Sequence, residues 1–141
     1  EDIVTFSYAD AGLKLYSNVI LASSKLIAEV PKAVAAFLRA TNRALIDTIA
    51  DPEEAVKYLK VFDPLADPKT GLEKLKILLR VINTDFAQRN GLGAIVKADV
   101  DNQVEDVTAA FGLKTKPSAD QIFNSGFLPP KSERIPRSAS K

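Results

Sequence analysis

A short stretch near the N-terminus carries the side chains best suited to hold a small molecule. Asp10 lies in a turn that contains Gly12, directly after an apolar segment. Ligands of α/β proteins bind beyond the ends of strands, and a carboxylate there suits an amine better than an anion. Asp is also a common turn former, so a purely structural role for Asp10 stays open.

Two polar residues follow this turn. Tyr16 and Asn18 are two positions apart and would share one face of a strand. Tyr16 could stack on a planar ring, and Asn18 could both donate and accept hydrogen bonds. A packed tyrosine and a loop asparagine are the structural alternative. Tyr8 is a further candidate contact, for which packing at a hinge is the alternative.

The residue types that are missing exclude much chemistry. The chain contains no His, Cys, Met or Trp. This removes catalytic triads, thiolate nucleophiles and the usual ligands of zinc and iron–sulfur clusters. A carboxylate cluster at Asp51, Glu53 and Glu54 is explained by helix capping rather than by a metal. We therefore predict no catalytic residue, no metal site and no cofactor.

Composition sets further limits. The chain has 141 residues, is 46% hydrophobic and has a net charge of +1, which is typical of one globular unit. Such a balanced charge does not favour binding to nucleic acid. Charged residues interrupt every apolar stretch before the roughly 20 residues that a membrane span needs. The first residue is Glu and no signal segment is recognisable, so we expect a processed chain or a fragment.

The pattern of apolar residues predicts two strands followed by helices. The β-branched and aromatic residues of segments 3–8 and 15–22 favour strands. Helices are predicted over 25–29, 31–50, 52–62, 68–90 and 98–111, with a short one after Ser118, from apolar spacing and from Asp-Pro and Ser start signals. Two strands do not form a stable sheet, so further polypeptide or a second copy must complete it.

Several short motifs in order resemble one family. They are Asp10/Gly12/Tyr16/Asn18, then Pro31/Val34/Phe37/Arg39/Ala40, then 50–53 with Ala55, and the ending 122–129. These motifs resemble the C-terminal part of ABC-transporter substrate-binding proteins of the nitrate/sulfonate/taurine and thiamine-pyrimidine-precursor group. The resemblance extends over residues 4–129.

The resemblance implies a type II periplasmic binding protein, in which two α/β lobes close over a small solute. The chain would be the C-terminal half of one α/β lobe, mainly α with two short N-terminal β-strands. Residues 1–130 would hold the hinge-crossing strand, the second strand and the helices, and residues 131–141 would be a mobile basic tail. The expected partners are a small ligand, with a thiamine pyrimidine precursor favoured, and an ABC permease. The expected location is the periplasm or another extracytoplasmic site.

Two other functions stay open. A pyrimidine synthase of thiamine biosynthesis shares this fold and consumes one of its own histidines, whereas this chain has none. A helical interaction module would use the apolar seam of segment 72–86 as a partner surface. Exposed apolar helix faces would also favour self-association.

Overall fold

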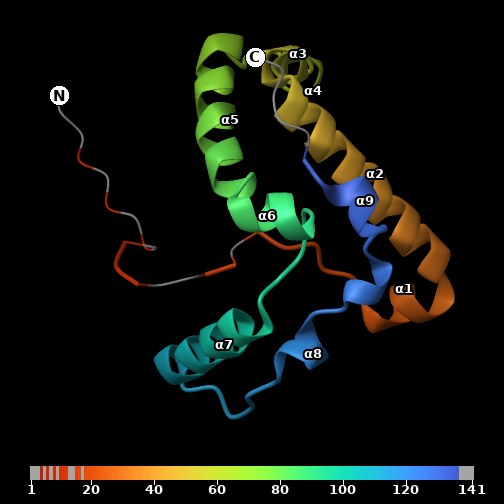
Figure 1. The fold of residues 1–141 in the computed structure, drawn as a ribbon, viewed down its shortest axis with the longest axis vertical. Coiled ribbons are helices and arrows are strands. Elements are labelled where there is room, and N and C mark those ends of the chain that lie inside the picture. The colour runs from red at the N-terminus through yellow and green to blue at the C-terminus, as the bar shows by residue number, and fades with distance from the viewer. Residues whose placement is uncertain are drawn as a thin grey trace. The chain divides into compact units, whose positions relative to one another are not determined.

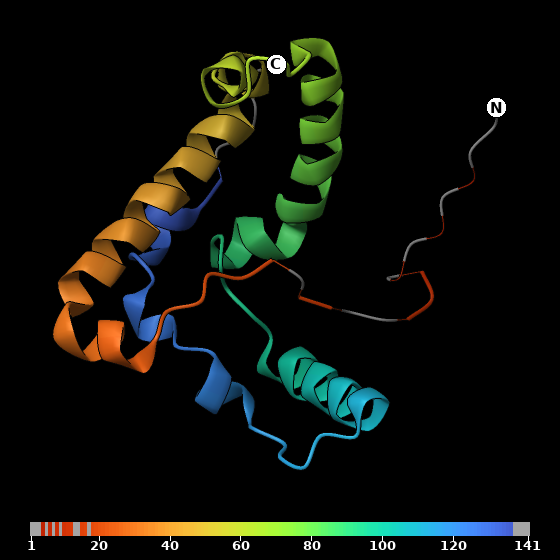
Figure 2. The same cartoon turned by 180° about the vertical axis from the view of Figure 1, so that it is seen from behind.

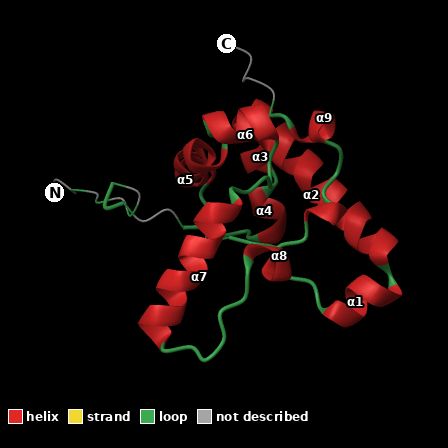
Figure 3. Cartoon of the chain, turned by 60° about the horizontal axis from the view of Figure 1, so that its bottom comes forward, coloured by secondary structure: helices red, strands yellow, loops and turns green. Residues whose placement is uncertain are grey.

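The structure, a computed structural model, describes residues 4, 6, 8, 10–12, 15, 16 and 18–136. Every regular element within these residues is a helix, as Figure 3 shows. The chain divides into two compact units, whereas its length predicts one. Unit 1 comprises Glu1–Ser23 and Ile95–Ser125, and unit 2 comprises Ser24–Ala94 and Gly126–Lys141.

The predicted fold class, with two N-terminal β-strands, is wrong. Segment 15–22 is irregular wherever it is described, and Val19 and Leu21 are 64% and 89% exposed. Residues 4, 6 and 8 of segment 3–8 are not in a strand either, and residues 3, 5 and 7 lie outside the described residues. A strand exists only through hydrogen bonds to a neighbouring strand, and the described residues supply none. High β-propensity alone is therefore not sufficient here.

Unit 2 is built on two long helices, α2 (Pro31–Ala50) and α5 (Pro68–Ile82), which Figures 1 and 2 show as two arms. Shorter helices extend and join these arms: α1 (Ser24–Glu29), α3 (Pro52–Lys57), α4 (Leu59–Phe62) and α6 (Asp85–Asn90). Helix α3 packs against both α2 and α5 and so turns the chain back between them.

The helix starts follow the predicted signals. The Asp51 carboxylate accepts a hydrogen bond from the Glu54 N–H at 2.9 Å, and Asp67 accepts one from the Thr70 N–H at 2.9 Å. Each aspartate precedes a proline at the first helical position, where a missing N–H costs nothing. Predicted helix 68–90 is interrupted between α5 and α6, where the Thr84 side chain caps α6.

A small apolar core holds unit 2 together. Ile49 of α2, Ala87 of α6 and Leu92 are buried, and half-buried side chains surround them: Leu45, Ile46, Leu79 and Ile82. Leu79 and Ile82 belong to the predicted seam of α5. The core thus joins α2 to the α5–α6 segment.

Unit 1 contains α7 (Lys97–Phe111) and α8 (Ala119–Ile122), which pack against each other. Gly112 ends α7 in the left-handed conformation, and a capping box between Ser118 and Gln121 begins α8, both as predicted. The Asp101 carboxylate of α7 accepts a hydrogen bond from the Ala119 N–H at 2.8 Å. This bond fixes the start of α8 on α7.

The C-terminal segment belongs to unit 2. It follows η1, a 3-10 turn at Ser125–Phe127, and forms α9 (Lys131–Arg134), which packs on α2. Residues 131–136, which composition assigns to a mobile tail, are therefore bound to unit 2. Residues 137–141 lie outside the described residues. Over the described residues, no helix combines the length and apolarity that crossing a bilayer requires.

The buried position of Ile49 predicts a large effect of truncation. Ile49 of α2 is 5% exposed. Ile77 lies on the face of α5 opposite its core seam and is 63% exposed. We expect Ile49→Ala to lower the free energy of unfolding by about 2–4 kcal/mol, because it leaves a cavity in the core. Ile77→Ala is the matched control and should change it by less than about 1 kcal/mol. Equal urea midpoints for the two variants would contradict this core.

The cap at Asp67 predicts a pH effect. The Thr70 hydroxyl, 2.6 Å from the carboxylate, and then the Thr70 N–H lower the pKa of Asp67 below its ordinary value of 3.8. A lowered folded-state pKa adds stability above the ordinary pKa, and this stability is lost as pH falls through the folded-state value. The wild-type chain should therefore lose more stability in acid than Asp67→Asn, whose cap does not titrate. Urea unfolding from pH 6 to about 3 would measure the difference, and parallel pH curves would contradict it.

Candidate functional site

Tyr16 is the predicted site residue that the structure fixes most firmly. Its N–H donates to Gln103 Oε1 at 2.8 Å, and its carbonyl accepts from Gln103 Nε2 at 2.9 Å. The Tyr16 hydroxyl accepts from the Val96 N–H at 2.9 Å, at the N-cap of α7. These hydrogen bonds join Tyr16 to α7. Tyr16 is half-buried, and its hydroxyl keeps its O–H for donation.

The other predicted site residues are exposed. Tyr8 and Asp10 lie in the turn that ends at Gly12, and Tyr8 is 74% exposed. Gly12 has φ +86°, which a residue with a side chain rarely adopts. Asn18 is exposed beyond Tyr16. The structure thus places all the predicted residues in unit 1, with Tyr16 alone among them anchored to α7 by its hydroxyl.

A hollow of about 480 Å³ lies between this turn and α7. It is lined by Gly12 and by polar residues of α7: Asp99, Asn102, Gln103, Glu105 and Asp106. Glu105 pairs with Lys116 at 2.9 Å, which offsets part of the negative charge. Carboxylates accept hydrogen bonds and amides both donate and accept them. The hollow therefore suits a solute rich in N–H donors or carrying a positive charge.

The sequence interpretation missed the α7 residues of this hollow. The prediction of this helix rested on its apolar positions and named none of its polar residues as candidate site residues. The available signal was the spacing of Asp99, Asn102, Gln103 and Asp106, which recur at three and four residues and therefore share a face. Gln103 connects the hollow with the site residues predicted near the N-terminus, because it lines the hollow and also forms hydrogen bonds with the Tyr16 backbone.

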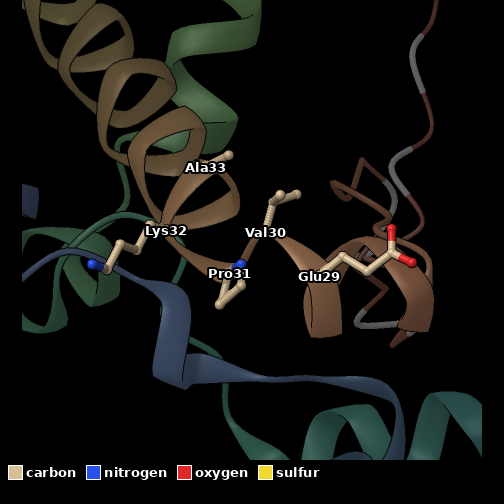
Figure 4. Close-up of a pocket in the computed structure, with 5 residues that line it drawn as sticks. All are labelled: Glu29, Val30, Pro31, Lys32 and Ala33. Carbon is tan, nitrogen blue, oxygen red and sulfur yellow. The ribbon is translucent and has the colours of Figure 1, made fainter.

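A second hollow, of about 460 Å³, lies at the bend between α1 and α2. Figure 4 shows its lining, which consists of the consecutive residues 29–33. The charged side chains of Glu29 and Lys32 point to opposite sides of the bend in this view. A bend without converging polar groups does not make a binding site.

The carboxylates of the described segments do not gather into a metal site. No group of three or more acidic residues there is arranged to hold an ion. Asp51 caps α3, as predicted, and Glu54 pairs with Lys57. The candidate site is therefore the polar hollow on α7.

Residues 1–55 match the family model described as NMT1/THI5 like. This segment contains Tyr8, Asp10, Tyr16 and Asn18, together with the motifs of α2 and the start of α3. The predicted family resemblance is confirmed. The α7 residues that line the hollow, between Asp99 and Asp106, lie outside the NMT1/THI5-like segment.

One curated relative supports the same assignment over a longer stretch. The chain is 32% identical over 119 residues to the riboflavin-binding protein RibY of Chloroflexus aurantiacus. The match covers 82% of this chain and 34% of that protein, so the chain spans about a third of the length of the relative. No solved structure matches the chain significantly.

The bond from Val96 to Tyr16 predicts a local effect of removing one hydroxyl. Tyr16→Phe leaves the Val96 N–H without this acceptor, at a cost of about 1 kcal/mol, so exchange of the Val96 amide hydrogen should accelerate roughly fivefold. Tyr8→Phe, at an exposed position, is the control and should leave this exchange unchanged. Unchanged exchange in Tyr16→Phe would show that the hydroxyl does not hold α7.

Proposed function

We propose that this chain is part of the solute-binding component of an ABC importer. The observation that carries the proposal is the position of the NMT1/THI5-like segment, which includes the residues whose side chains suit a small ligand. The similarity to a riboflavin-binding protein supports solute binding as well. The expected partners are a small-molecule ligand and an ABC permease, and the expected location is extracytoplasmic.

We further propose that the solute is a planar nitrogen heterocycle, with a thiamine pyrimidine precursor as the favoured example. Such a heterocycle offers N–H donors to carboxylates and amides, through the amino group in the case of the pyrimidine precursor, and it offers one face to a tyrosine. Asp99, Asn102 and Gln103 supply acceptors in the hollow, and Asp10 lies in the adjoining turn. Among the residues that the structure describes, those lining the hollow include no basic side chain, which disfavours nitrate and sulfonates. Riboflavin, the ligand in the name of the relative RibY, is a second heterocycle of this class.

Capture and release in this proposal need no chemical step. A ligand that binds one arrangement of the protein more tightly than another shifts the population toward that arrangement. Binding would thereby mark the loaded protein for delivery to the permease. We do not propose catalysis. The pyrimidine-synthase alternative stays a prediction, and a histidine outside this sequence would support it.

A helical interaction module is the second candidate, and one observation favours it. The described residues are helical without a strand, and α5 exposes Ile77 and Val81 on the face opposite its core seam. An apolar face of this kind is typical of a surface that a partner helix covers.

Isothermal titration calorimetry tests the proposed function. The titrants are hydroxymethylpyrimidine, riboflavin and taurine, added to the chain alone and to a longer protein that contains it. We expect a heterocycle to bind and taurine not to bind. Asp10→Asn should weaken binding about tenfold, since a hydrogen bond to a charged group contributes roughly 1.5–3 kcal/mol.

Asp47→Asn is the matched control, because Asp47 is an exposed carboxylate of unit 2. It should leave the affinity unchanged. Binding of taurine without a heterocycle would overturn the ligand class. Absence of binding by the longer protein, with well-folded material, would overturn the function and favour the interaction module.

A further inference from the structure

The C-terminal segment grips unit 2 through polar contacts at two places. We name residues 126–136 the C-terminal strap. The chain leaves unit 2 after Ala94, forms the second part of unit 1, and returns to unit 2 at Gly126. The strap therefore meets residues that lie some forty to ninety positions earlier in the sequence, as its hydrogen bonds to Leu92 and Arg39 show.

The first place is the backbone of Leu92. The Leu92 N–H donates to the Arg134 carbonyl at 2.8 Å, and the Leu92 carbonyl accepts from Arg134 Nη1 at 2.6 Å. The Arg134 Nε also donates to the Pro129 carbonyl at 2.8 Å. One arginine thus satisfies both polar groups of a buried residue and closes the strap on itself. This two-way pairing resembles the way a bound peptide pairs with a protein backbone.

The second place is an ion pair between α2 and α9. Arg39 Nε lies 2.8 Å from Glu133 Oε2, and Arg39 Nη2 lies 3.1 Å from Glu133 Oε1. This two-pronged geometry selects a carboxylate and fixes its direction. The two side chains are 61% and 44% exposed, so the pair adds specificity more than stability.

Two glycines shape the surface that receives the strap. A Cβ built on Gly91 would lie 2.9 Å from the Arg134 Cβ, and one on Gly93 would lie 3.2 Å from Leu128 Cδ2. Both glycines have positive φ, +87° and +76°. The backbone around Leu92 is therefore bare where the strap lies, as is common where another chain segment approaches closely.

The side chains that form the core of unit 2 all precede the strap in the sequence. The buried cluster of Ile49, Ala87 and Leu92 and the half-buried side chains around it all come from residues 45–92. The strap lies over the backbone around Leu92, and its own Pro129 and Pro136 are buried, so its release would expose apolar surface as well as remove polar contacts.

We propose that unit 2 carries a peptide-binding site, formed by Arg39 and residues 91–93, which the C-terminal strap occupies in cis. The matching peptide has a Glu-Arg pair followed by Ile-Pro, as in residues 133–136. The glutamate binds Arg39, and the arginine pairs with Leu92. Because the occupant is tethered, a free peptide competes with a high local concentration of the strap. When the strap is released, the site accepts the same sequence from a second molecule.

The test uses the full chain and a fluorescent peptide of residues 126–136. The variant Glu133→Ala/Arg134→Ala removes the grip of the strap and leaves the acceptor residues intact. We expect the peptide to bind this variant at least about tenfold more tightly than the wild-type chain, whose own strap competes. Exchange of the Leu92 amide hydrogen should accelerate by a similar factor in the variant and slow again when peptide is added.

Lys131→Ala/Ser132→Ala is the matched control on the same short helix, and it should behave as wild type. A peptide in which alanine replaces the arginine is the matched ligand control and should not bind.

Should circular dichroism show that the double variant does not fold, the exchanged pair Arg39→Glu/Glu133→Arg takes its place. Glu133→Arg alone should accelerate exchange of the Leu92 amide hydrogen. The exchanged pair should return this exchange to the wild-type rate.

Wild-type exchange at Leu92 in the folded double variant would overturn the proposal, because the strap would then not be gripped by Arg134. Fast exchange without peptide binding would overturn it too, because the segment would then be terminal packing and not a ligand. In the exchanged pair, failure of the two substitutions to compensate would do the same. None of these outcomes bears on solute binding, which calorimetry measures separately.

Discussion

The burial of Leu92 is the constraint on which unit 2 depends. Its side chain is 3% exposed and completes the core between α2 and α6, and its backbone sits between two glycines. A buried backbone N–H and carbonyl must find partners, because leaving either unpaired costs about 1–3 kcal/mol. The helix before Leu92 has ended, so Arg134 supplies both partners. The position of the C-terminal strap follows from this requirement.

In unit 1, a side chain rather than a backbone strand pairs with the N-terminal segment. Its N-terminal segment has no strand partner among the described residues, and the Gln103 side chain pairs with the Tyr16 backbone instead. A primary amide can donate and accept at once, so one glutamine replaces one step of a strand ladder. The same glutamine lines the polar hollow of α7. Anchoring of the segment and shaping of the candidate site are therefore carried by one residue.

Local signals predicted the helices well and the strands badly, and the reason is physical. Asp51, Asp67 and Ser118 mark helix starts through contacts within three residues, which the chain carries with it. Segment 15–22 has the composition of a buried strand, but a strand is defined by a partner that composition cannot specify. Of the candidate site, Tyr16 was predicted either to stack on a planar ring or to be a packed tyrosine, and the sequence left both possibilities open. The structure uses its hydroxyl to hold Val96.

By itself, the sequence determined the helix starts, the seam of α5, the excluded chemistries and the family resemblance. The helix starts and the seam rest on spacings of three or four residues, the excluded chemistries on residue types, and the resemblance on the order of short motifs along the chain. The tertiary structure decided the division into two units, the polar face of α7 that meets the Gly12 turn, and the return of the strap to Leu92. Such features join residues about 40 to 90 positions apart. They arise because buried polar groups must be paired wherever the fold brings them, a condition that no local pattern records.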